Sequence, residues 1–191
     1  IDSDGSIWQL VAEGKRAWHA GVSRWHAMEN LNHYSIGIEL SSPTMGQNGY
    51  PPQQIKSLLQ LCRQIMRHYQ IKKVNVVGHS DVAPTRKPDP GKTFPWQYLA
   101  KKGIGLWYDL ADADKIAEND VEKLLQTIGY DTGNLPAASY AFCRHFVPQA
   151  VATWDNINAL CQEIYPPDFV LPAEYLPILK ACAYRFAKNN R

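Results

Sequence analysis

Residues 78–91 hold most of the side chains in this sequence that could do metal or acid–base chemistry. They follow a short apolar segment and include a His, an Arg, a Lys and two Asp. His79 and Asp89 lie on either side of a proline-rich stretch and could reach one divalent metal, and zinc accepts both imidazole and carboxylate ligands at about 2.0–2.2 Å. The alternative is a structural His79, hydrogen-bonded to a neighbouring Asp.

Glu39 is the second candidate because its carboxylate lies in an apolar run. Residues 35–40 predict a short buried strand. Burying a carboxylate costs free energy unless the group has a partner or a function. The alternative is a Glu at the end of the strand that faces solvent.

The elements around these residues predict an α/β core. Apolar residues from Ile55 to Tyr69 recur at helical spacing, and Pro51 or Pro52 suits the first turn of that helix. Residues 74–78 predict a second strand. Strand, helix and strand in this order are typical of an α/β fold.

The start of the sequence predicts one arm of a hairpin. Asp4 and Gly5 form a turn signal, and residues 6–10 are expected to form the strand that follows. The sequence begins with Ile1 rather than Met, so we expect a further segment upstream.

Beyond residue 110 the pattern is helical. Helices are expected at 119–129, with Asn119 as N-cap and Gly129 as stop, and at about 136–146, 151–164 and from 177. We therefore divide the chain into residues 1–110, a linker at 111–118 and a helical module at 119–191. The four cysteines show no zinc-finger spacing and are expected to be buried thiols, with a disulfide among Cys143, Cys161 and Cys182 as the alternative.

Composition excludes several classes of protein. The 191 residues carry a net charge of +2, well short of the basic excess that a nucleic-acid partner favours. No run approaches the roughly 18 apolar residues of a membrane span. With 45% hydrophobic residues, the chain has enough apolar content for a folded core.

Three segments together resemble the zinc-dependent N-acetylmuramoyl-L-alanine amidases of the type-2 family, which are related to peptidoglycan recognition proteins. They are residues 17–21 (AWHAG), 31–40 (LNHYSIGIEL) and 78–91 (GHSDVAPTRKPDPG). The resemblance covers about residues 1–109. More loosely, residues 121–146 are similar to a small helical peptidoglycan-binding module. The expected fold is α/β, with a mixed central sheet flanked by helices, plus a small all-α C-terminal module.

The resemblance implies a role for each matching residue. His79 and Asp89 match two of three zinc ligands, and the third is expected upstream of Ile1. Glu39 matches the general base and Lys87 the residue that stabilises the oxyanion. The implied reaction is hydrolysis of the amide between N-acetylmuramic acid and L-alanine in peptidoglycan or muropeptides.

Other side chains are expected to bind substrate or to lie on the surface. Trp18, His19 and Arg86 are expected to line the substrate groove, with a solvated loop charge as the alternative for Arg86. Three further histidines, His26, His33 and His68, are expected on the surface.

The main functional alternative is a non-catalytic peptidoglycan-binding protein with an incomplete metal site. For location, a wall-binding module favours the periplasm or outer membrane over the cytoplasm.

Overall fold

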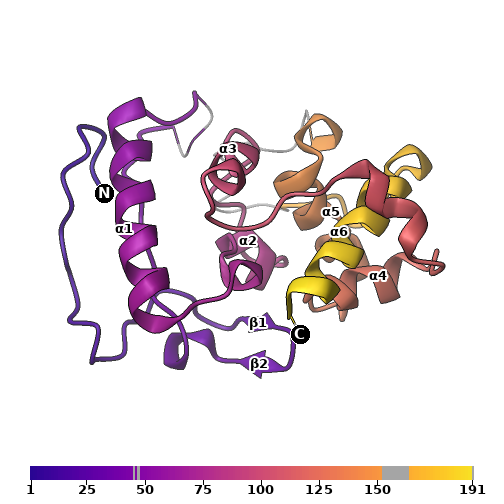
Figure 1. Ribbon diagram of the computed structural model, residues 1–191, viewed down its shortest axis with the longest axis horizontal. Helices are drawn as coiled ribbons and strands as arrows, with labels where there is room; N and C mark the ends of the chain where they lie inside the picture. The colour runs from indigo at the N-terminus through magenta and orange to yellow at the C-terminus, as the bar shows by residue number, and fades with distance from the viewer. Residues whose placement is uncertain (45, 47, 152–163, 191) are drawn as a thin grey trace.

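Helices form almost all of the regular structure in this computed structural model, which describes residues 1–44, 46, 48–151 and 164–190. Figure 1 shows α1 on one side, α2 and α3 in the middle and α4, α5 and α6 on the other side, with a small hairpin below. The α-helices are α1 (Pro52–Tyr69), α2 (His79–Val82), α3 (Trp96–Lys101), α4 (Val121–Ile128), α5 (Leu135–Phe146) and α6 (Leu176–Asn190). The short 3₁₀ helices are η1 (Leu31–His33), η2 (Lys73–Asn75), η3 (Leu110–Lys115), η4 (Pro148–Val151) and η6 (Ala173–Tyr175).

The helix predicted from Pro51 or Pro52 to Tyr69 is confirmed as α1. Pro52 occupies its first turn, and Gln70 ends it in the left-handed conformation with φ of 55°. The apolar face of α1 packs against α3 and the loops beside it. The core they share contains Ile55, Leu58, Leu59, Cys62, Phe94, Trp96, Leu99 and Ile104.

The mixed central sheet expected from the sequence is not present in the described residues. Their one sheet is the antiparallel pair β1 (Arg24–Trp25) and β2 (Met28–Glu29). Residues 35–40 are largely exposed, and η2 takes up the start of residues 74–78. A strand needs a neighbouring backbone to pair with. The backbone of residues 39 and 41 bonds to Ile1 rather than to a second strand, through Ile1 N to Glu39 O at 2.6 Å and Ser41 N to Ile1 O at 2.9 Å.

The turn at Asp4 and Gly5 is confirmed. Gly5 has φ of 90°, and its N–H donates to Asp2 O at 2.9 Å. The Ser57 hydroxyl of α1 donates to Gly5 O at 2.7 Å and holds the turn on that helix. Residues 6–10 do not form the expected strand, and Trp8 and Leu10 are 69% and 85% exposed.

The C-terminal helices share one core with the N-terminal half. Trp25, Val74 and Val82 belong to the same buried cluster as residues of α4, α5 and α6, including Leu124, Phe142 and Phe186. The segment expected to be a linker overlaps η3, and Asp112 in η3 accepts from Arg185 Nε of α6 at 2.6 Å. The C-terminal helices are therefore packed against the first half of the chain.

Details of the C-terminal helices differ from the sequence prediction. The N-cap of α4 is Asp120, whose carboxylate accepts from Lys123 N at 3.2 Å, rather than Asn119, and Gly129 ends the helix as expected. The helices expected from 136 and 177 are confirmed as α5 and α6. The helix expected at 151–164 falls largely outside the described residues. Cys62, Cys143 and Cys182 are buried free thiols, and Cys161 is also outside the described part.

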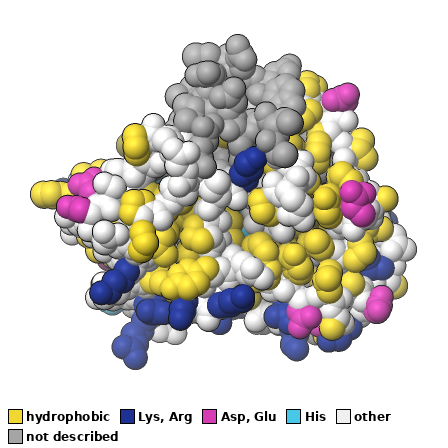
Figure 2. Space-filling view, turned by 90° about the horizontal axis from the view of Figure 1, so that it is seen from above, with side chains coloured by type: hydrophobic (Ala, Val, Ile, Leu, Met, Phe, Trp, Pro, Cys, Tyr) yellow, Lys and Arg dark blue, Asp and Glu magenta, His cyan; other side chains and the backbone are white. Residues whose placement is uncertain are grey.

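The surface is mixed in charge and partly apolar. Figure 2 shows Lys and Arg side chains gathered along one edge of the displayed face, with exposed hydrophobic side chains between them. In the described part of the chain, no helix is long and apolar enough to cross a membrane.

His26, expected on the surface, is half-buried between the two halves of the molecule. The backbone N–H of His26 donates to Gly129 O at 2.8 Å. The Trp25 ring lies beside the His26 ring, with the ring centroids 5.3 Å apart. Burial lowers the pKa of His26 below 6.5. The unfolded chain therefore binds more protons than the folded chain below that pH, and stability should fall as pH is lowered through it.

We expect the stability difference between the wild type and His26→Asn to depend on pH. Asn tolerates the left-handed conformation of this position, where φ is 52°. Urea unfolding at about pH 8 and about pH 5.5 measures the effect. The wild type should lose more stability than His26→Asn on acidification. An equal loss in both proteins would contradict the assignment.

Candidate metal and substrate site

His79 begins α2, and both nitrogens of its ring face acceptor oxygens. Nδ1 lies 3.1 Å from Asp89 Oδ2, and Nε2 lies 3.1 Å from Ala20 O. A neutral imidazole has one N–H, so it can donate to only one of these oxygens. If Nε2 donates to Ala20 O, Nδ1 faces the Asp89 carboxylate with a lone pair, which is the form of imidazole that binds a metal. A metal-binding His usually donates its second ring N–H to a carboxylate, a backbone carbonyl or water.

Asp89 is held in the ionised form that metal binding requires. Burial raises the pKa of Asp89, but the hydrogen bond and charge of His79, with a contribution from the Lys87 charge, outweigh this effect and leave the pKa below 3.8. Ser80 N donates to Asp89 O at 2.9 Å, which fixes the loop across the start of α2. Metal binding requires a deprotonated carboxylate.

The donors of His79 and Asp89 fit zinc in type, since zinc binds imidazole nitrogen and carboxylate oxygen. Catalytic zinc sites normally have three protein ligands. Among the residues that the structure describes, no group of three or more His, Cys, Asp and Glu side chains could hold a metal. The described residues therefore supply two ligands of the expected set.

The backbone of residues 19–22 forms the wall of the site beside His79. The Asn32 side chain accepts from His19 N at 3.0 Å and from Ala20 N at 2.8 Å. Arg86 donates to Ala20 O at 3.0 Å and also to Val22 O. Ala20 O is thus shared by the His79 ring and the Arg86 guanidinium.

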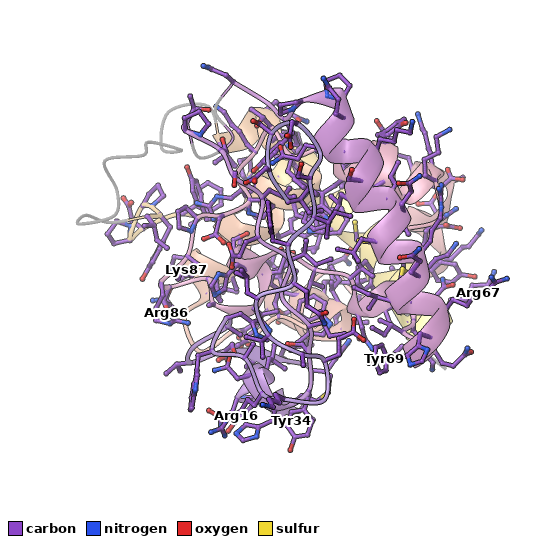
Figure 3. The ribbon with its side chains drawn as sticks, turned by 90° about the vertical axis from the view of Figure 1, so that its left-hand side faces the viewer. Arg16, Tyr34, Arg67, Tyr69, Arg86 and Lys87 are labelled. Carbon is purple, nitrogen blue, oxygen red and sulfur yellow. The ribbon has the colours of Figure 1, made fainter. Side chains whose placement is uncertain are left out.

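Arg86 and Lys87 follow α2 on the loop that leads to Asp89. Figure 3 shows both side chains projecting from the same side of the molecule. Arg86 is exposed, although its Nη2 already bonds to two carbonyls. The charge of Lys87 contributes to the low pKa of Asp89. Arg86 holds the backbone of residues 20–22 through its hydrogen bonds.

Trp18 and His19 differ in how they are held. Trp18 is 77% exposed, with the Arg16 guanidinium carbon 4.2 Å from its ring centroid. The His19 ring packs against Gly37, and its Nε2 lies 2.9 Å from Ser35 Oγ. A Cβ at position 37 would lie 2.5 Å from the His19 ring, so only glycine fits there. Trp18 is therefore free to contact a ligand, whereas His19 holds residues 35–37 in place.

Glu39 is exposed. This agrees with the alternative in which the Glu39 carboxylate faces solvent rather than the core. Its backbone carbonyl bonds to the amino group of Ile1. Its carboxylate makes no hydrogen bond or ion pair within the described ranges. The structure therefore brings His79 and Asp89 into contact, while Glu39 lies on the neighbouring segment that packs against His19.

Sequence reasoning did not assign a role to three buried polar residues, one in α2 and two in the C-terminal half. Asp81, Tyr130 and His145 form a hydrogen-bonded cluster that links α2 to the C-terminal helices. The available signal was His145, a titratable side chain beside Phe146 near the end of a largely apolar helix. The partner could not be identified, because Asp81 lies 64 positions away.

Comparison with known sequences finds relatives over about half of the chain. Residues 1–92 match the family model described as N-acetylmuramoyl-L-alanine amidase. The N-acetylmuramoyl-L-alanine amidase AmiD of Escherichia coli K12 is 48% identical over 110 residues, which cover 54% of this chain and 40% of that protein. The 1,6-anhydro-N-acetylmuramyl-L-alanine amidase AmpD of Enterobacter cloacae is 42% identical over 96 residues, which cover 50% of each protein. The match thus spans half or less of these relatives' length.

Two solved structures resemble the chain over most of its length. The E. coli AmiD complex with the substrate anhydro-N-acetylmuramic acid-L-Ala-D-γ-Glu-L-Lys superposes with a TM-score of 0.73 at 34% identity, covering 95% of this chain and 74% of that one. AmpDh3 of Pseudomonas aeruginosa gives a TM-score of 0.73 at 34% identity, covering 93% and 72%. The fold similarity includes the C-terminal helices, which the family model does not reach. With its motif loop, its His79–Asp89 pair and this similarity, the chain belongs to the N-acetylmuramoyl-L-alanine amidase family.

Proposed function

We propose that the protein is a zinc-dependent hydrolase that cleaves the amide between N-acetylmuramic acid and L-alanine. The observation that carries the proposal is the His79 ring, whose Nδ1 faces an ionised Asp89 while Nε2 faces a backbone carbonyl. Membership of the amidase family supports the reaction type. The substrates would be peptidoglycan or muropeptides, in cell-wall remodelling or recycling.

The proposed mechanism assigns one task to each side chain. His79 and Asp89 hold the metal, with a third ligand proposed from a His that precedes Ile1. When bound, zinc supplies polarisation of the carbonyl and a lowered pKa of a water ligand, towards about 7. Glu39 accepts the proton of the attacking water and passes it to the leaving amine. Lys87 donates to the carbonyl oxygen as negative charge develops on it.

Substrate contacts are proposed for the exposed residues beside this site. The AmiD structure contains a muramyl tripeptide as its substrate, which supports a ligand with a sugar and a charged peptide. Trp18 offers an exposed aromatic face, and the remaining donors of Arg86 could pair with a stem-peptide carboxylate. His19 is proposed to shape the groove by holding Gly37.

The alternative proposal is a non-catalytic peptidoglycan-binding protein. The observation in its favour is that the described residues bring two metal ligands together and no third. Against it, the chain carries both Glu39 and Lys87. A protein that only binds the wall has no need for an oxyanion partner at that position.

Zinc titration and turnover of the same variants test the proposed function. The full-length protein, with the proposed His that precedes Ile1, should bind one zinc per chain and release the tripeptide from anhydro-N-acetylmuramic acid-L-Ala-D-γ-Glu-L-Lys. Asp89→Asn should lose both properties, because the amide is a much weaker metal ligand than the carboxylate. Asp114→Asn, which changes an exposed Asp in the same way, should keep both. Unaltered zinc affinity in Asp89→Asn would contradict the proposed site.

The location in the cell is proposed to be the envelope, as a periplasmic or outer-membrane-associated protein, with the cytoplasm as the alternative. Support comes from the substrate class, since polymeric wall lies outside the cytoplasm. Fractionation of cells that express the full-length protein would decide between them.

A further inference from the structure

Asp81 lies two residues after the proposed ligand His79 and has a completely satisfied carboxylate. The residue is 1% exposed. Its Oδ2 accepts from Gly78 N at 2.7 Å and from His145 Nδ1 at 2.8 Å, and its Oδ1 accepts from the Tyr130 hydroxyl at 2.7 Å. Two of its three donors therefore come from the C-terminal half of the chain.

Those two donors are themselves held rigidly. The His145 ring stacks on Trp96 of α3 with centroids 4.0 Å apart and planes 16° apart. The Tyr130 ring meets Trp25 edge to face at 5.3 Å. Burial raises the pKa of Tyr130, and the Asp81 charge raises it further, so the hydroxyl stays protonated as a donor.

The helix that carries His79 cannot hold its own conformation. α2 has four residues, and a single helical turn gains too few hydrogen bonds to offset the cost of ordering its backbone. The Asp81 bond to Gly78 N fixes the residue directly before His79, and Tyr130 and His145 fix Asp81. Within the described residues, the His79 ring itself has two hydrogen-bond neighbours, Ala20 O and Asp89.

We propose that Tyr130 and His145 are positioning residues for the metal ligand His79 and act through Asp81. The inference rests on the proposed function. It gives the C-terminal half of the chain an indirect part in the amidase site, because Tyr130 and His145 set the orientation of residues 78–82 through Asp81. Residues that orient a metal ligand typically change metal affinity by about 10–100-fold when they are lost.

Tyr130→Phe tests the proposal by removing one hydroxyl while keeping the aromatic ring. The matched control is Tyr165→Phe, which removes the hydroxyl that accepts from Asn134 Nδ2 at 2.9 Å, also in the C-terminal half. Two quantities are measured besides thermal stability: zinc affinity, by competition with a chelating dye, and amide hydrogen exchange of peptides that cover residues 78–82.

We expect Tyr130→Phe to weaken zinc binding about tenfold and to speed exchange at residues 78–82, with both unchanged in Tyr165→Phe. A loss of thermal stability alone, with exchange and zinc affinity as in the wild type, would overturn the positioning role. A wild type that binds no zinc would refute the proposed function instead. In that case unchanged exchange in Tyr130→Phe rejects the positioning role, and faster exchange at residues 78–82 supports it.

Discussion

Removal of residues 119–191 is expected to abolish the cooperative unfolding transition of residues 1–118. Trp25 is 3% exposed, and its ring packs against Tyr130 and Phe186 of the deleted part. Val74 and Val82 belong to the same buried cluster. Exposing a large buried apolar side chain costs about 1.5–3 kcal/mol. Loss of several such contacts is comparable with the roughly 5–15 kcal/mol that stabilise a whole domain.

Circular dichroism melting of the truncated and intact chains measures this effect, and a peptidoglycan pull-down beside it separates two roles for the helices. A module that only binds the wall would leave residues 1–118 with a normal melting transition and reduced sedimentation with peptidoglycan, because a second binding site acts through avidity. A truncated chain with a wild-type melting temperature would contradict the shared core. Equal sedimentation in that folded chain would also remove support for wall binding.

The accuracy of the sequence prediction depended on how local each structural signal was. α1 was predicted closely because its apolar face and its starting proline all lie within Pro52–Tyr69. The turn at Gly5 was predicted for the same reason. Strands depend on neighbours elsewhere in the chain, and in the described residues the backbone of 35–40 bonds to Ile1 rather than to a second strand. The apolar pattern of residues 35–40 alone could not show that the expected strand would lack a second strand to pair with.

The same distinction applies to the site. His79 and Asp89 were found because both lie in one short loop, and the structure brings their side chains to 3.1 Å. The bonds from Tyr130 and His145 to Asp81 span 49 and 64 positions. Nothing in the local sequence pairs those residues. Arg86 was expected to face a ligand. The local sequence around Arg86 could not show that it binds the backbone carbonyls of residues 20 and 22.

Glu39→Gln is expected to lower kcat on the muramyl tripeptide by about 10²–10⁴-fold, the usual cost of losing a general base. Zinc affinity should be unchanged, because Glu39 is not a proposed metal ligand. The carboxylate is exposed and lacks a partner in the described structure. Catalytic hydrogen bonds often form only in the substrate complex. The lack of a partner for the Glu39 carboxylate within the described residues therefore agrees with its proposed role as proton acceptor.

Lys87→Met should give the companion result, because it removes the charge and keeps the length of the side chain. The loss of one oxyanion donor costs about 10²–10³-fold in kcat. Lys87 also contributes to the low pKa of Asp89, so this variant should alter zinc affinity slightly, unlike Glu39→Gln.

Glu174→Gln, at an exposed position in η6, is the matched control for Glu39→Gln. Near wild-type kcat in Glu39→Gln would show that another group accepts the proton, and the general base would then have to be sought among side chains that close on the substrate.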